Sequence, residues 1–267
     1  MSLWDEISPK KREMFLRASK PAQVTGASLN TSCETFVLTL KDKKNLDSDE
    51  IGPLAESFRH ALLTRVEGFG VTALRLRSEA EIQHQGIPVL HKYGRLNGVK
   101  ESVRAIVSAL EHVVLRLQGR DSCEAVYELD WDPQDSAERE LKAGALSKPE
   151  IGIEVVNSDL TLLHFTGRPV RLHMTLHIQK GRGFVSNEEM RAPWRGSRET
   201  RREVFLIPLS VNFSPVIRVG YRSVERQRHT VSFEVETKGN VTPAEAWRQG
   251  WDDLNARHRQ SRTGKAK

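Results

Sequence analysis

The chain has 267 residues, of which 38% are hydrophobic and 28% charged, enough apolar material for one large folded domain or two smaller ones. Its apolar runs are shorter than the roughly 18 residues of a membrane span, and its first residues lack the apolar segment of a secretory signal, so we expect neither class. Two cysteines, Cys33 and Cys123, are too few for a disulfide framework or a Cys-based zinc site.

The formal net charge of +6 is concentrated at the end of the chain. From Asn255 onward, NARHRQSRTGKAK contains five Lys or Arg residues and no acid, while the remainder is close to neutral. Such a tail is either a solvated terminus or a source of salt-sensitive affinity for polyanions. We therefore expect no more than weak, non-specific contact with DNA.

The first predicted elements are a strand over 34–40, a helix over 51–66 and a strand over 71–77. The helix follows from an apolar stripe at helical spacing, with Pro53 in its first turn. Two glycines after residue 66 end it. The stripe contains six residues, namely Ile51, Leu54, Ala55, Phe58, Leu62 and Val66.

A second helix and a strand are predicted within 98–119, GVKESVRAIVSALEHVVLRLQG. Apolar residues recur at helical spacing from Val99 to Leu110, and from Val113 they alternate with other residues at period two. The segment therefore predicts a helix that packs on its own sheet, running into a strand with no loop between them. The acidic stretch 120–150 that follows is interpreted as a surface excursion.

Regular alternation returns at residue 170. PVRLHMTLHIQ places five apolar residues on one face and polar residues on the other, which is typical of an antiparallel sheet with one buried face. Further strands are predicted over 204–211 and 231–237. The sequence TPAE from Thr242 to Glu245 predicts a capping box and a helix whose stripe contains Trp247, Trp251 and Leu254. The fold class is therefore α+β, with largely antiparallel sheets and packed helices.

No arrangement of residues in the chain predicts catalysis strongly. Glu128, Asp130 and Asp132 could hold Mg²⁺, which makes a small metal-dependent nuclease the alternative function. His173 and His177 are four residues apart on a strand, about 13 Å, too far to share one metal ion. Gly181–Gly183 lacks the remainder of a phosphate-binding motif. We accordingly assign no catalytic residue, metal ligand or cofactor.

Two apolar helix stripes stand out because the predicted sheets are small. From these stripes we expect six residues to form a homodimer interface as well as core, namely Ile51, Phe58, Leu62, Trp247, Trp251 and Leu254.

Five segments, in order, resemble the amino-terminal region of the RNA polymerase alpha subunit of bacteria and plastids. They are distributed across about 200 residues, and their order makes the resemblance specific. The segments are RHALLTRVEG (59–68), HKYGRLNGVKESV (91–103), KGRGFV (180–185), FSPVIRVGY (213–221) and TKGNVTPAEA (237–246).

The resemblance implies a discontinuous dimerisation domain, 30–68 and 214–260, interrupted by an inserted domain, 69–213, with flexible termini at 1–29 and 261–267. It implies a non-catalytic subunit of DNA-directed RNA polymerase, a nucleotidyltransferase. Such a subunit forms a homodimer and scaffolds assembly of the large beta and beta-prime subunits for transcription. By the same resemblance, contacts to the large subunits are expected from seven residues, Arg59, His60, Gly98, Val99, Lys100, Glu101 and Arg182.

Several positions depart from the family pattern. His60 replaces the second arginine of a pair, Glu111 replaces a lysine at a helix end, and SDEIGPLAES (48–57) replaces a glycine-rich segment. The carboxy-terminal DNA-binding domain of the family is expected to be absent. These features favour a plastid chain, in the chloroplast stroma, or a bacterial paralogue in the cytoplasm.

Overall fold

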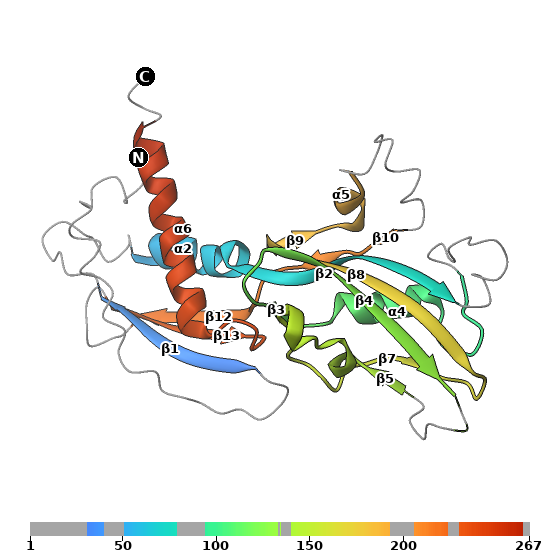
Figure 1. Cartoon of the computed structure of the whole chain (residues 1–267). Coiled ribbons are helices and arrows are strands. Elements are labelled where there is room, and N and C mark those ends of the chain that lie inside the picture. Colours follow the sequence, from blue (N-terminus) through green and yellow to red (C-terminus); the bar gives the residue numbers. More distant parts are fainter. Residues whose placement is uncertain are drawn as a thin grey trace, which may run out of the picture. The chain divides into compact units, whose positions relative to one another are not determined.

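The computed structural model describes residues 31–39, 51–78, 94–132, 134, 140–192, 206–223 and 230–263, with the backbone alone described at 39, 51, 78 and 257–263. The chain divides into two compact units, each shown in Figure 1. Unit 1 comprises 1–67 and 214–267, and unit 2 comprises 68–213. The fold class is α+β with antiparallel sheets, as the sequence predicts.

Unit 1 is a three-stranded antiparallel sheet packed against two helices. The strand order is β1-β13-β12, so strands from the two ends of the chain lie side by side. The elements are β1 (Ser32–Thr39), α2 (Ile51–Arg65), β12 (Val216–Ser223), β13 (Thr230–Thr237) and α6 (Pro243–Thr263).

Local sequence accounts for both helices of unit 1. The predicted capping box is confirmed, because the Glu245 carboxylate accepts from the Thr242 backbone N–H at 3.0 Å and the Glu245 N–H donates to the Thr242 hydroxyl at 3.2 Å. Pro243 occupies the first helical position, where its missing N–H has no cost. Helix α2 covers the predicted range to within one residue. Helix α6 continues to Thr263, past the expected domain end at 260.

Unit 2 is built on a four-stranded sheet in the order β10-β2-β8-β4, namely β10 (Ile207–Pro208), β2 (Glu67–Ser78), β8 (Val170–Arg182) and β4 (Ser122–Trp131). Three strand pairs surround it: β3 (Leu115–Leu117) with β6 (Ile153–Val155), β5 (Glu140–Lys142) with β7 (Thr161–His164), and β9 (Phe184–Val185) with β11 (Val211–Asn212). The helices are α4 (Val103–Glu111), α5 (Asn187–Arg191) and the short 3-10 helices η4 (Ala143–Leu146) and η5 (Pro149–Ile151).

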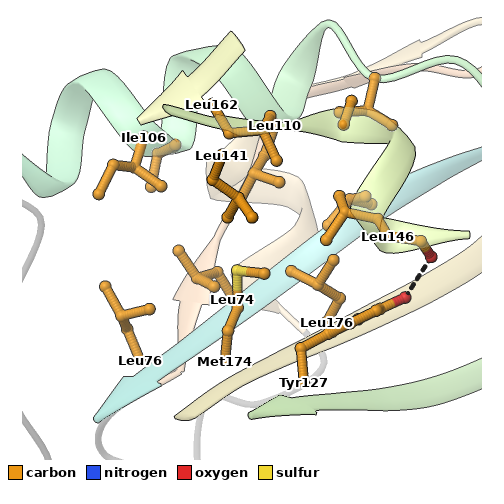
Figure 2. Packing of buried hydrophobic residues seen from close by; sticks show 14 of the residues in the cluster. Leu74, Leu76, Ile106, Leu110, Tyr127, Leu141, Leu146, Leu162, Met174 and Leu176 are labelled. Atoms are coloured by element: carbon orange, nitrogen blue, oxygen red, sulfur yellow. Dashed lines mark hydrogen bonds between the residues drawn. The ribbon is translucent and has the colours of Figure 1, made fainter. Parts of the chain in front are cut away.

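Helix α4 covers one face of this sheet. Ser102 caps it, its hydroxyl accepting from the Ala105 N–H at 3.3 Å, and its apolar face is buried as predicted. Figure 2 shows Ile106 and Leu110 of α4 on the same side of the sheet as Leu74, Met174 and Leu176. The next strand, β3, begins only at Leu115, so residues 112–114 form a short connection that the sequence interpretation omitted.

Two interpretations of the sequence are wrong. The segment 120–150 is not a surface excursion, because β4 lies within it and buries Ala125, Tyr127 and Trp131 against the core. Its acids occupy alternate, outward positions, which hid the period-two pattern. The single strand predicted over 204–211 is interrupted in its described part: Ile207–Pro208 pairs with β2, whereas Val211 pairs with β9. The chain changes sheets there, following a proline that cannot donate.

In the described ranges, none of the helices has the length and apolar character required to cross a lipid bilayer.

Candidate partner-binding surfaces

The first surface lies on unit 1, where α2 meets the edge strand β12. Arg59 is only partly available to a partner: its Nε donates to the Val219 carbonyl at 3.1 Å and its Nη1 lies 2.8 Å from Glu56 Oε1. The guanidinium therefore joins α2 to β12. His60, the next residue, is exposed, which leaves its imidazole accessible from solvent.

Sequence reasoning missed two residues of the same strand. Ile217 and Tyr221 of β12 are 46% and 39% exposed, unusually open for large apolar side chains. Burial, and then the hydrogen bond and charge of Glu56, raise the pKa of Tyr221. Ile217 lies at a break in the strand register, between Val216 and Arg218, and no sequence pattern indicated that break.

The second surface is the segment Gly98–Glu101 of unit 2. The prediction of a helix from Val99 onward is wrong for its first residues, because α4 begins at Val103. The segment is instead extended along 164–166: the Lys100 N–H donates to the His164 carbonyl at 2.9 Å and the Thr166 N–H to the Gly98 carbonyl at 2.9 Å. Gly98 and Val99 are buried and Lys100 is exposed.

Only glycine fits at position 98, because of the backbone conformation there and because a neighbouring side chain leaves no room for a Cβ. Its φ of +81° favours glycine, and a Cβ there would overlap the side chain of Val170. Gly98 therefore contributes to the fold of the segment and has no side chain to offer a partner.

Glu101 is held by its neighbour strand and is not free to reach outward. One carboxylate oxygen accepts from the His164 backbone N–H at 2.7 Å, and the other lies 2.7 Å from His164 Nδ1. Burial by itself would raise the pKa of Glu101, but the hydrogen bonds from His164 outweigh it and the pKa is lowered. Glu101 thus fixes the segment that presents Lys100.

Arg182 lies far from this segment. Gly98 packs against Val170, the first residue of β8, whereas Arg182 is the last. Thirteen residues of extended chain place the two ends of β8 roughly 40 Å apart, so the two predicted contacts do not form one patch. Beside Arg182, Phe184 of β9 is 67% exposed, and sequence reasoning did not single it out.

Five of the six residues predicted at the dimer interface are buried within unit 1. Phe58, Leu62, Trp247, Trp251 and Leu254 are at most 8% exposed and belong to the core of unit 1. The stripes of α2 and α6 face each other and their own sheet, so these five side chains are not available to a second copy. The side chain of Ile51 lies outside the described residues.

Glu111, a departure from the family pattern, has an internal partner. Its carboxylate accepts from the Ser210 backbone N–H at 2.9 Å and so holds the connection between β10 and β11. A lysine could not accept this hydrogen bond.

The geometry gives no support to a nuclease. Glu128 lies 3.7 Å from His173 and Asp130 lies 2.9 Å from Arg171, so each carboxylate faces a side chain of β8. Asp132 accepts from the Gln134 N–H at 2.9 Å. Across the part of the chain that the structure describes, no group of three His, Cys, Asp or Glu residues is placed to hold a metal ion.

Comparison with known proteins gives a consistent result. Residues 75–197, which lie within unit 2, match the family described as "RNA polymerase Rpb3/RpoA insert domain". A DNA-directed RNA polymerase subunit alpha of Aquifex aeolicus (strain VF5) is 25% identical over 208 residues, covering 75% of this chain and 58% of that protein. The alignment is longer than unit 2 and therefore extends into unit 1. The chain is thus similar to an RNA polymerase alpha subunit over most of its length, and the match to the Rpb3/RpoA insert domain lies inside its unit 2.

Proposed function

We propose that the chain is an assembly subunit of a DNA-directed RNA polymerase, which dimerises and scaffolds the two large beta and beta-prime type subunits. The observation that carries the proposal is the family match over 75–197 together with an alignment that continues into unit 1. The chain covers 58% of the length of its Aquifex aeolicus relative, and the activity named for that relative is transferred here as a proposal.

In this proposal the chain contributes binding surfaces and the large subunits contribute the chemistry. Lys100 supports such a role because it is exposed on a backbone segment fixed by Glu101. His60, Ile217 and Tyr221 provide a second exposed surface, on unit 1. An exposed aromatic or aliphatic residue beside charged groups is the composition expected at the centre of a protein interface.

The proposed homodimer uses the outward sides of α2 and α6, because their apolar stripes are already buried. Arg248 and Asp252 on α6 are exposed there. The proposed site of action is the cytoplasm of a bacterium or the stroma of a plastid, where bacterial-type polymerases work. Contact of this chain with DNA is proposed to be weak, non-specific and dependent on the basic tail after Asn255.

Affinity purification of the tagged chain from its native host tests the assembly role. The expected result is co-purification of two large subunits, identified by mass spectrometry as beta and beta-prime type. Light scattering of the purified chain should give about twice its mass of 30.3 kDa. Recovery of the chain without large subunits would overturn the proposed function.

A pair of matched variants tests the surface at Lys100. Lys100→Glu should reduce recovery of the large subunits at least tenfold. In the proposal the Lys100 ammonium meets acidic groups of the partner, and a glutamate there would repel them. Arg120→Glu, which reverses another exposed charge of unit 2, should leave recovery unchanged. Equal recovery with both variants would place the contact elsewhere.

A further inference from the structure

Strand β4 forms one edge of the sheet in unit 2. It pairs with β8 without a break from Ser122, opposite Gln179, to Trp131, opposite Val170. Among the strands that the structure describes, none pairs with its other side. A ten-residue edge strand presents a row of backbone N–H and C=O groups that another extended segment can join.

Backbone contacts show which of these groups face outward. Asp121, directly before the strand, accepts from the Lys180 N–H at 2.8 Å. Hydrogen-bonded and non-bonded pairs alternate in an antiparallel ladder, so the odd-numbered residues of β4 bond to β8. The even-numbered residues therefore direct their N–H and C=O groups to the open side. These residues are Ser122, Glu124, Val126, Glu128 and Asp130.

A lysine contact supports this orientation independently. Lys148 Nζ donates to the Val126 carbonyl at 2.6 Å, and the same ammonium lies 4.7 Å from the centre of the Tyr127 ring. A positively charged donor thus already occupies one position on the β4 edge. Its flexible four-carbon stem allows it to leave without a change in the backbone.

The edge is strongly acidic. Residues 121–132 contain five Asp or Glu residues and no Lys or Arg. Asp121 and Glu128 have 84% and 78% of their side chains exposed, so their pairing with Lys180 and His173 leaves most of each carboxylate in water. Val126, between them, is 48% exposed. This charge repels nucleic acid and favours a basic polypeptide.

We propose that the β4 edge binds an extended, basic polypeptide segment as an added strand. The incoming strand would displace the Lys148 ammonium from the Val126 carbonyl. Backbone groups of Glu124, Val126 and Glu128 would pair with the segment, and two Lys or Arg side chains, four residues apart in the segment, would lie beside the carboxylates of Glu124 and Glu128. An apolar residue of the segment would cover Val126. The inference does not depend on the proposed polymerase function.

A synthetic peptide, acetyl-TKTVTKT-amide, which carries Lys, Val and Lys on one face, tests the site on the full chain. Fluorescence anisotropy of the labelled peptide should show saturable binding that weakens with added salt. Amide hydrogen exchange should slow at Glu124, Val126 and Glu128. A peptide methylated at alternate backbone nitrogens, which keeps the charge but removes donors, should bind at least tenfold more weakly.

Variants of exposed residues separate this site from general charge attraction. Glu124→Lys combined with Glu128→Lys should weaken binding at least tenfold, whereas Asp159→Lys combined with Glu188→Lys, an equal charge change elsewhere on unit 2, should change it by less than twofold. Lys148→Met removes the donor that occupies the Val126 carbonyl and should therefore tighten binding several-fold. Circular dichroism melts should confirm that each variant folds.

Three results would overturn the proposal. One is the absence of saturable binding to the folded wild-type chain. Another is equal binding of the methylated peptide, which would show charge attraction without strand pairing. The third is slowed exchange confined to strands other than β4.

Discussion

The cores of the two units are filled with different kinds of side chain. In unit 1, aromatic rings from the sheet and both helices meet: Phe58 lies 4.6 Å from Trp247, 5.5 Å from Phe233 and 5.6 Å from Trp251, measured between ring centres. In unit 2, leucine, valine and isoleucine side chains from many elements form a longer core, part of which is shown in Figure 2.

The two units differ in how many side chains share the buried apolar area that stabilises each core. The helices of unit 1 reach their sheet through a few large rings, so much of the buried area depends on one residue, Phe58. The aliphatic core of unit 2 spreads its area over many small contributions. A single substitution should therefore damage unit 1 more than a comparable substitution damages unit 2.

Phe58→Ala should have the largest effect. The side chain is fully buried, so its removal leaves a cavity among three rings and should lower the free energy of unfolding of unit 1 by about 3 to 5 kcal/mol. Urea denaturation followed by tryptophan fluorescence measures it. Met174→Ala, in the core of unit 2, is the comparison and should cost less. An equal or greater loss at Met174 would contradict the proposed difference.

Gly250→Val tests the close approach of α6 to α2. A Cβ at Gly250 would lie 2.8 Å from Leu62 Cδ2, and Leu62 is fully buried and cannot move aside freely. The expected loss is about 2 to 3 kcal/mol, from overpacking. Gly52→Val is the control, since no atom lies within 4 Å of a Cβ there. A similar thermal shift in both variants would show that helix propensity dominates.

Glu101→Gln should destabilise unit 2 by about 1.5 kcal/mol at neutral pH, because a charged acceptor is replaced by a neutral one. The lowered pKa of Glu101 means that its contribution is present above its ordinary value of 4.5 and is lost as the pH falls through the folded-state value. Urea midpoints of wild type and variant should therefore converge in acid. A gap that stays constant below pH 4.5 would contradict the role of the charge.

Tyr127→Phe should have the smallest effect, about 1 kcal/mol. The buried hydroxyl donates to the Leu146 carbonyl at 2.7 Å, as Figure 2 shows, and phenylalanine leaves that carbonyl without this donor. Thermal melts of the variant measure the loss. If Tyr127→Phe is as damaging as Phe58→Ala, then unit 2 also depends on single contacts.

Much of the fold could be predicted from the sequence because its elements have local signals. Helix α6 follows from its capping box, and the buried residues of β8 follow from strict alternation. Strand β4 was missed because its outward acids suggested a loop, although its inward residues alternate at the same period. The signal was present but was outweighed by composition.

The candidate surfaces were less predictable because they depend on contacts between distant residues. Glu101 is held by His164, and no local pattern links the two positions. Likewise, the apolar stripes of α2 and α6 look the same in sequence whether they meet each other or a second copy. Only the packing around Phe58 shows that they meet each other.

Unit 1 is formed by two separate stretches of the chain, and this delays its folding during synthesis. Strand β1 is made early, but β13, its hydrogen-bonded neighbour, is reached only after all of unit 2 has been translated. At ordinary rates of protein synthesis the delay is about 10 to 40 s. During that time β1 and the apolar stripe of α2 have no native sheet to join, whereas unit 2 has all its strands before β13 is made. A nascent chain should therefore need protection by a chaperone mainly at its amino-terminal part, until α6 emerges from the ribosome.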